Sequence, residues 1–236
     1  MPYFYRMLKD EHIEQLVVKY IKSGDTVSIG TSGLGEAFLK KLAVALAAKH
    51  VDLENVKFVP TSNRLAVVAS QLHLPLVSLN DSEIDVAIEF ADSVDFDFNF
   101  IKRDSFSLVR DKMIAQSAGL LVVVADPKNY SKKLSGPIPF EVTTFGWKRT
   151  LNQLSVFGKA SLVEANGSPK KTETGNFIVS VFCDPMYSFE EIEMQSKQIP
   201  GVLETGLFLG YADKILLHNK HIKMVSRLKA EKRVWA

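Results

Sequence analysis

The chain has 236 residues, which is enough for one large domain or two modest ones, and its 46% hydrophobic and 24% charged residues are ordinary globular values. A net charge of +2 gives no overall field that favours nucleic acid, and no apolar stretch approaches the roughly 18 residues of a membrane span, so we expect neither partner. Cys183 is the only cysteine, which excludes a disulfide within the chain and is typical of a reducing, cytoplasmic location.

Helical and extended patterns alternate along the first 130 residues. Apolar side chains recur at helical spacing over residues 13–21, and Ser23-Gly24-Asp25 is expected to end that helix. The pattern then predicts strands at 26–30, 56–60, 75–79, 84–90 and 120–125, with helices over 38–50 and 64–73 between the earlier ones. Because these apolar runs are largely uninterrupted by polar positions, they indicate strands covered on both faces, as in a parallel sheet built from βαβ units.

The pattern changes after about Leu134. Extended runs and helical segments there suggest a small α+β unit, and residues 167–176 (GSPKKTETGN) read as a polar hairpin loop between two of its strands. Short strands return over the last thirty residues. We therefore predict one domain from residues 1–133 together with 206–236, and an inserted α+β domain at 134–205.

Polar side chains follow the predicted strands, at the edge where ligands bind in open parallel sheets. Polar turns without a function are the alternative interpretation for any single one of them. Together they predict hydroxyls, glycines, carboxylates and a lysine at one edge, from Thr31, Ser32, Gly33, Thr61, Ser62, Glu89, Asp92, Asp126 and Lys128.

The turn TSGLG at residues 31–35 precedes a predicted helix and is a plausible anion cradle. Backbone N–H groups and the helix dipole favour a phosphate there, and Gly33 and Gly35 allow it to approach. The motif lacks the lysine of a P-loop and the full dinucleotide fingerprint. His218 and His221 suggest a metal pair, but three-residue spacing on a strand points them to opposite faces, so no metal site is expected.

Several segments resemble, in order, the sequence blocks of type A ribose-5-phosphate isomerases. They are residues 59–79 (VPTSNRLAVVASQLHLPLVSL), 88–115 (IEFADSVDFDFNFIKRDSFSLVRDKMIA), 122–142 (VVVADPKNYSKKLSGPIPFEV) and 200–217 (PGVLETGLFLGYADKILL). The resemblance implies an α/β fold with a Rossmann-like parallel-sheet domain and a smaller inserted ferredoxin-like lid domain. It also implies interconversion of ribose 5-phosphate and ribulose 5-phosphate without metal or cofactor, by a homodimer or homotetramer.

The resemblance also implies roles for particular residues. Lys102, Asp92 and Lys128 match a family lysine, the second aspartate of the signature and a later lysine. Asp111 stands where the family has its catalytic glutamate, and Glu89 stands where it has the first aspartate, so the two side chains are exchanged in length. The implied catalytic residues are Asp111, Lys102, Asp92 and Glu89, and the implied substrate-binding residues are Thr31, Ser32, Gly33 and Lys128.

Other positions depart from the family pattern. Its glycines after the lysine are replaced here by Arg103, Asp104 and Ser105, and further departures are Leu34, Ser93 and Val163. The alternative function is therefore a non-catalytic relative that binds a sugar phosphate or a partner protein.

Three interpretations concern the segment from Glu89 to Lys112. Asp95 and Asp97 are expected in a solvated loop, and Phe96, Phe98 and Phe100 alternate as in a packed edge. Asp111 is expected on a helix with Phe106, Val109 and Met113 packed below it, and the alternative is an exposed carboxylate beside Arg110 and Lys112.

Overall fold

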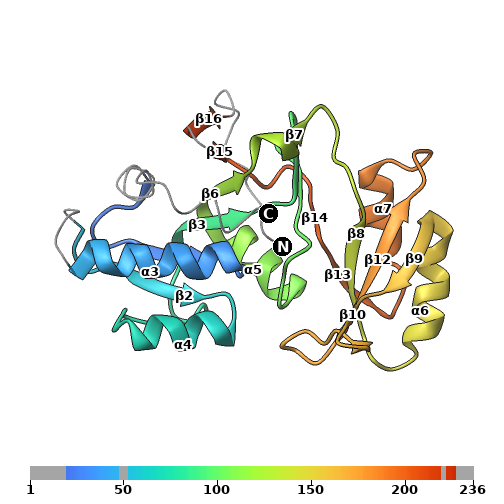
Figure 1. The fold of residues 1–236 in the computed structure, drawn as a ribbon, viewed down its shortest axis with the longest axis horizontal. Helices are drawn as coiled ribbons and strands as arrows, with labels where there is room; N and C mark the ends of the chain where they lie inside the picture. The colour runs from blue at the N-terminus through green and yellow to red at the C-terminus, as the bar shows by residue number, and fades with distance from the viewer. Residues whose placement is uncertain (1–19, 48–52, 219–221, 227–236) are drawn as a thin grey trace.

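The computed structural model describes residues 20–47, 53–218 and 222–226. Its centre is a six-stranded sheet with the order β16-β15-β6-β3-β1-β2 (Figure 1). Five strands run parallel to their neighbours, and β16 is added antiparallel at one edge. The bounds are β1 (Thr26–Ile29), β2 (Lys57–Pro60), β3 (Ile84–Phe90), β6 (Ala118–Ala125), β15 (Lys214–His218) and β16 (Ile222–Ser226). The predicted parallel α/β sheet is confirmed.

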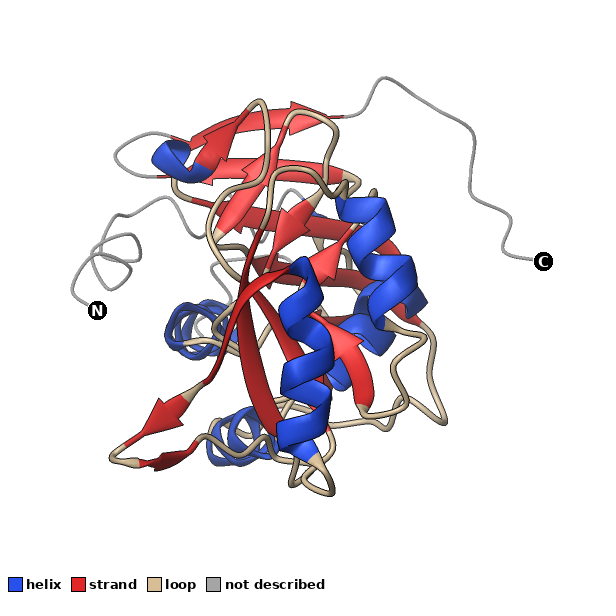
Figure 2. Ribbon diagram, turned by 90° about the vertical axis from the view of Figure 1, so that its right-hand side faces the viewer, coloured by secondary structure: helices blue, strands red, loops and turns tan. Residues whose placement is uncertain are grey.

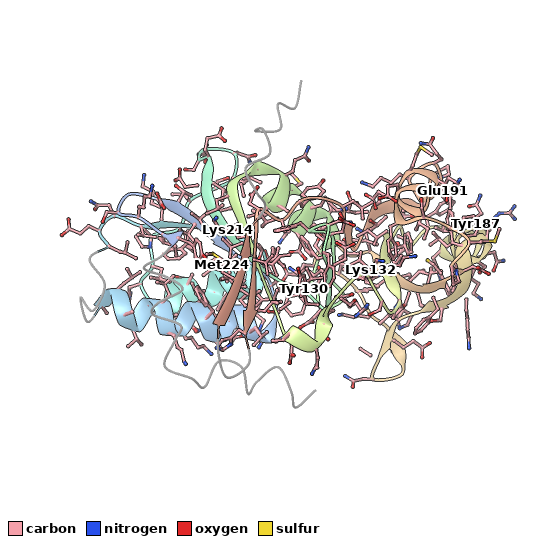
Figure 3. All side chains as sticks on the ribbon, turned by 90° about the horizontal axis from the view of Figure 1, so that it is seen from above. Tyr130, Lys132, Tyr187, Glu191, Lys214 and Met224 are labelled. Atoms are coloured by element: carbon pink, nitrogen blue, oxygen red, sulfur yellow. The ribbon has the colours of Figure 1, made fainter. Side chains whose placement is uncertain are left out.

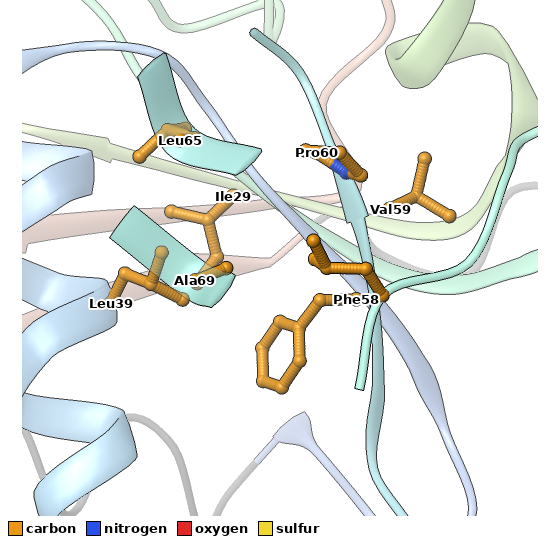
Figure 4. Close-up of a pocket in the computed structure, with 8 residues that line it drawn as sticks. Ile29, Leu39, Phe58, Val59, Pro60, Leu65 and Ala69 are labelled. Atoms are coloured by element: carbon orange, nitrogen blue, oxygen red, sulfur yellow. The ribbon is translucent and has the colours of Figure 1, made fainter. Parts of the chain in front are cut away.

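Helices cover both faces of this sheet. On one face, Val86 and Ile88 of β3 share a core with α3 (Gly33–Ala47) and α4 (Asn63–Gln71). On the other face, Ala87 shares a core with α5 (Leu108–Ser117). Figure 4 shows a small apolar pocket within the first core, between β1, β2 and the two helices, lined by Ile29, Leu39, Phe58, Val59, Pro60, Leu65, Ala69 and Leu76.

A smaller sheet stands beside the main one and carries the segment that precedes α5. Its order is β14-β5-β4-β7, from β4 (Ser93–Asp95), β5 (Phe100–Ile101), β7 (Tyr130–Ser131) and β14 (Leu207–Phe208). The rings of Phe100 and Phe208 stack across it with centroids 4.4 Å apart. This stacking holds β5 and therefore helps to fix Lys102, the residue that directly follows the strand.

A third sheet is antiparallel and has the order β13-β8-β12-β9. We call the unit from β8 to β13 the lid. Its elements follow the chain order βαββαβ, which with this strand order is a ferredoxin-like arrangement. Helices α6 and α7 cover one face of the sheet (Figures 1 and 2). The bounds are β8 (Ile138–Val142), α6 (Trp147–Leu154), β9 (Gly158–Leu162), β12 (Phe177–Cys183), α7 (Phe189–Ser196) and β13 (Val202–Thr205).

The connection into the lid runs between the two larger sheets. In Figure 3, Tyr130 and Lys132 lie between Lys214 and Met224 on one side and Tyr187 and Glu191 on the other. Remaining short elements are η1 (Pro127–Asn129), η2 (Ser155–Phe157) and the hairpin of β10 (Glu164–Ala165) with β11 (Ser168–Pro169). The predicted boundaries at 133/134 and 205/206 stay a prediction.

Some expectations from the sequence need correction. Residues 75–79 form no extended strand, and only Leu76 bridges to Phe58. The Phe58 N–H donates to the Pro75 carbonyl and the Val77 N–H to the Phe58 carbonyl, but Pro60 has no N–H with which to extend the pairing. Of the expected helix at 13–21, only residues 20 and 21 are described. His221 also lies outside the described residues. Within the described part of the chain, no helix has the length and apolarity that crossing a membrane requires.

Candidate active site

Three charged side chains from different elements meet in the interior. Glu89 is near the end of β3, Lys102 follows β5, and Asp111 is in the first turn of α5. Lys102 Nζ lies 2.5 Å from Glu89 Oε2 and 3.0 Å from Asp111 Oδ2. The side chains of Glu89 and Lys102 have 0% exposure and that of Asp111 has 1%. We call these three residues the ion triplet.

The start of α5 is built to hold Asp111. Ser107 is the N-cap of the helix, and its hydroxyl accepts from the N–H of Arg110. Ser105 Oγ donates to Asp111 Oδ2 at 2.6 Å and accepts from the N–H of Ser107 at 3.0 Å. Ser105, where the family pattern has glycine, therefore contacts the candidate base directly, which the sequence alone did not indicate.

The ion triplet contains two carboxylates and one ammonium group in a place without solvent. Burial raises the pKa of Glu89 to about 7, although the Lys102 ammonium opposes this. Burial also raises the pKa of Asp111, against the opposing effects of Lys102 and the Ser105 hydroxyl. Burial lowers the pKa of Lys102, but the two carboxylates outweigh it and raise that pKa above its ordinary value. The ammonium group therefore stays charged, while Glu89 can take up a proton near neutral pH.

Each carboxylate uses only one of its oxygens within the ion triplet. Glu89 Oε1 and Asp111 Oδ1 accept no hydrogen bond from any described residue, although both atoms are buried. Buried acceptors usually have a donor, and those that lack one are often found at functional sites. A carboxyl group that can hold a proton, a carboxylate and an ammonium group together form an arrangement suited to general acid–base chemistry.

Asp92 lies beside the ion triplet and does not enter it. Asp92 Oδ2 accepts from the backbone N–H of Arg103 at 2.6 Å and from that of Asp104 at 3.4 Å. The Arg103 side chain extends to the carbonyl oxygens of Ser135 and Pro137. Asp92 therefore fixes the turn immediately after Lys102.

The predicted anion cradle adjoins the ion triplet at Gly30. A Cβ on Gly30 would lie 2.2 Å from Glu89 Oε2, and a Cβ on Gly35 would lie 1.9 Å from the Gly30 carbonyl oxygen. Gly33, by contrast, is exposed, and nothing lies within 4 Å of a Cβ built on it. The close packing of this turn against Glu89 therefore depends on Gly30 and Gly35. Gly30 was not among the residues that the sequence indicated.

The hydroxyl groups of the cradle already have partners. Thr31 Oγ1 is 2.5 Å from Thr61 Oγ1, and both residues are buried. Ser32 Oγ accepts from the N–H of Gly35, as the cap of α3. Lys128 lies in η1 at the same end of the sheet, with 56% side-chain exposure and an ion pair to Asp126 at 3.4 Å. It is therefore outside the buried ion triplet.

The surroundings of Asp111 differ from both expectations. Its carboxylate is buried, whereas Met113, which was expected to pack below it, is 52% exposed. The buried face of α5 is formed by Leu108, Asp111, Lys112, Ile114 and Ala115. Lys112 is buried as well and reaches the other way, to Glu193 at 3.1 Å and Glu204 at 3.2 Å in the lid. Helix α5 thus presents charged groups both to the ion triplet and to the lid.

The loop after β4 also differs from expectation. Asp95 is buried. Its carboxylate is satisfied there by hydrogen bonds from the backbone N–H groups of Asp97 and Asn99 and from the Asn99 side chain. Phe98 has a φ of 66°, which breaks the strand alternation. Phe98 and Phe100 are buried, whereas Phe96 is exposed and packs against Tyr130.

Two further residues considered from the sequence lie away from the ion triplet. His218 is buried at the end of β15, and no group of three metal-binding side chains occurs among the described residues. Cys183 is half-buried at the end of β12, and burial raises its pKa to about 11, so its thiol is a poor nucleophile at neutral pH.

The sequence and the fold are both similar to those of known proteins. The family model of ribose 5-phosphate isomerase A (phosphoriboisomerase A) matches residues 57–221. Ribose-5-phosphate isomerase A of Prochlorococcus marinus (strain MIT 9312) is 33% identical over 212 residues, which cover 87% of this chain and 89% of that protein. The enzyme of the same name from Bacillus mycoides (strain KBAB4) is 30% identical and covers 89% and 97%.

Solved structures of ribose 5-phosphate isomerases have the same fold as this chain. Ribose 5-phosphate isomerase from Plasmodium falciparum superposes with a TM-score of 0.85 at 26% identity, covering 94% of this chain and 99% of that one. A D-ribose-5-phosphate isomerase in complex with phospho-erythronic acid has the same TM-score at 28% identity, covering 95% and 98%. The chain therefore belongs to the ribose 5-phosphate isomerase A family.

Proposed function

We propose that this chain interconverts ribose 5-phosphate and ribulose 5-phosphate through an enediolate. The observation that carries the proposal is the ion triplet, in which Lys102 lies between two buried carboxyl groups. Membership of the family and the relatives' names support the same reaction. The three side chains meet despite the exchanged lengths of Glu89 and Asp111, which favours the isomerase over the non-catalytic alternative.

Isomerisation needs two proton movements, one between carbons and one between oxygens. Asp111 is the group we assign to remove the proton from C2 of the open-chain aldose and return it to C1. Glu89 is assigned to move the hydroxyl proton between the two oxygens, because a pKa of about 7 lets it both donate and accept near neutral pH. Lys102 stabilises the negative charge of the enediolate with its ammonium group. We assign Asp92 a positioning role, since it holds the turn that follows Lys102.

The phosphate is assigned to the N-terminus of α3. The hydroxyls of Thr31 and Ser32 already have partners, so backbone N–H groups near Gly33 and the helix dipole would make the main contribution. Lys128 would add a positive charge from the end of β6, which lies beyond β3 from β1 in the sheet. The close approach of Gly30 to Glu89 supports this assignment, because a substrate held at both ends needs a phosphate site near the ion triplet.

We propose that the protein assembles as a homodimer or homotetramer. Leu207, Phe208 and Phe100 are buried within the single chain and are not available for association. Among the described residues, the two most exposed large apolar side chains belong to the lid, Phe145 at 93% and Met186 at 75% exposure. We further propose a cytoplasmic location, on the evidence of the single cysteine.

The proposed function is tested by incubating the purified protein with ribose 5-phosphate and measuring ribulose 5-phosphate. In parallel, the melting temperature is recorded with increasing sugar phosphate for wild type, Gly33→Asp and Gly33→Ala. Wild type and Gly33→Ala should be stabilised, whereas the carboxylate in Gly33→Asp should repel the phosphate and remove the shift. Absence of turnover by wild type would contradict the proposed reaction, and equal shifts in all three proteins would contradict the proposed phosphate site.

A further inference from the structure

Glu141 is a buried carboxylate that the reaction scheme does not use. It lies on β8 of the lid, with 0% exposure. Its neighbours Phe140 and Val142 point into the lid core beneath α6 and α7. Because side chains alternate along a strand, Glu141 points to the opposite face, toward α5.

Both carboxylate oxygens of Glu141 are fully engaged. Oε2 accepts from Ser107 Oγ at 3.3 Å and from the N–H of Val109 at 3.2 Å, which are the N-cap and second residue of α5. Oε1 accepts from three side chains of the loop at residues 172–176, which precedes β12 and which we call the lid loop. The donors are Thr172 at 2.8 Å, Thr174 at 2.6 Å and Asn176 at 3.0 Å. All five donors are neutral, so the negative charge is stabilised by hydrogen bonds and by the positive end of the α5 dipole.

These contacts control where the first turn of α5 stands. The backbone N–H of Asp111 donates to the Ser107 carbonyl, so Asp111 moves with the residue that Glu141 holds. The Asp111 carboxylate in turn lies 3.0 Å from Lys102 Nζ. A displacement of Ser107 would therefore change the distance between the proposed base and both Lys102 and the substrate carbon.

The same lid loop is anchored to the main domain at a second place. The Glu173 carboxylate accepts from the N–H of Asn63 at the start of α4, at 2.7 Å, and pairs with Arg110 at 3.0 Å. The backbone N–H of Glu173 donates to the Phe106 carbonyl at 2.8 Å. Loop 172–176 is therefore a fixed support from which Glu141 holds α5.

We infer that Glu141 is a positioning residue for the isomerase reaction, which holds the first turn of α5 so that Asp111 meets Lys102 and the substrate. The inference rests on the proposed function. It assigns to the lid a direct structural influence on the base, through a carboxylate that does not touch substrate.

The test compares Glu141→Ala and Glu141→Gln with wild type. Readouts are kcat and KM for ribose 5-phosphate and the hydrogen-exchange rate of backbone amides at residues 107–112. Glu141→Ala should lower kcat by about 100-fold, with KM changed less than about threefold, because misplacing a catalytic group by about 1 Å has that effect. Amides at residues 107–112 should exchange faster. Glu141→Gln keeps one acceptor oxygen, so its kcat should be restored to within about fivefold of wild type, with exchange still faster than wild type.

Ser188→Ala is the matched control. Ser188 is the N-cap of α7 and forms a capping box with Glu191, so its loss should lower the melting temperature. Helix α7 is linked to α5 by the ion pair of Glu193 with Lys112, whereas the Ser107 cap is held by Glu141. The kcat of Ser188→Ala and its exchange at residues 107–111 should therefore equal those of wild type. A loss of kcat in Ser188→Ala as large as in Glu141→Ala would show that general destabilisation is responsible and would overturn the inference.

Other outcomes separate the inference from the proposed function. A folded Glu141→Ala with wild-type kcat overturns the inference, and if that variant does not fold, a Glu141→Gln with wild-type kcat and exchange overturns it instead. If wild type does not convert ribose 5-phosphate, the proposed function fails. The exchange data then decide alone: faster exchange at residues 107–112 in the Glu141 variants supports the positioning of Asp111, and unchanged exchange overturns it.

Discussion

Replacing Glu89 by glutamine should make the protein relatively more stable as the pH rises. Burial raises the pKa of Glu89 from an ordinary 4.5 to about 7, so the folded protein binds this proton more tightly than the unfolded chain does. The resulting stability is fully present below about pH 4.5 and is lost as the pH rises to about 7. With about 1.4 kcal/mol for each pKa unit, the loss is about 3 kcal/mol. Glutamine resembles the protonated acid and does not titrate, so the variant avoids this loss.

The assay is urea unfolding of wild type and Glu89→Gln in buffers from pH 4.5 to pH 8. The free energy of unfolding of the variant, minus that of wild type, should increase by about 3 kcal/mol across this range and stay level above it. Glu164 in β10 is exposed, so Glu164→Gln serves as the control and should show no such trend. A difference for Glu89→Gln that does not change with pH would refute the conclusion that burial keeps this carboxyl group protonated.

Three further predictions follow from the ion triplet and the surface. Gly30→Ala should lower the free energy of unfolding by about 2 kcal/mol, because the new Cβ would meet Glu89 Oε2. Gly33→Ala should change the free energy of unfolding by less than about 0.5 kcal/mol, and equal urea midpoints for the two variants would contradict this difference. Asp111→Glu alone should lower kcat because the buried triplet lacks room for a methylene, and adding Glu89→Asp should restore it; a double variant no faster than the single one would contradict the exchanged-length interpretation. Light scattering should report at least twice the 26.3 kDa of one chain, and a monomer at micromolar concentration would refute the proposed assembly.

Much of the fold follows from local patterns in the sequence. The run from Ile84 to Phe90 is apolar because Val86 and Ile88 face one helical layer while Ala87 faces the other. The pattern fails where an apolar run cannot complete its hydrogen bonds. Residues 75–79 are such a case, since Pro60 of β2 has no N–H to extend the pairing beyond the one bridge at Leu76.

The candidate site could be predicted from the sequence only at the positions that match a sequence block of the family. The resemblance identified Glu89, Lys102 and Asp111, and the structure brings these three together. It did not indicate that Asp111 is buried or that Ser105 binds it, because these facts depend on how α5 packs. Glu141 could not be found at all, since its donors lie 31 to 35 residues away in sequence and such contacts leave no periodic pattern.

The central claim is that Asp111 carries the proton between C2 and C1 of the sugar phosphate. It is tested most directly by measuring turnover of ribose 5-phosphate and deuterium incorporation from D₂O, for wild type and Asp111→Asn, with ligand-induced melting shifts recorded on the same samples. Wild type should form ribulose 5-phosphate and incorporate deuterium at C1, whereas Asp111→Asn should do neither and still be stabilised by the sugar phosphate. Turnover and deuterium incorporation by Asp111→Asn at the wild-type rate would contradict the account.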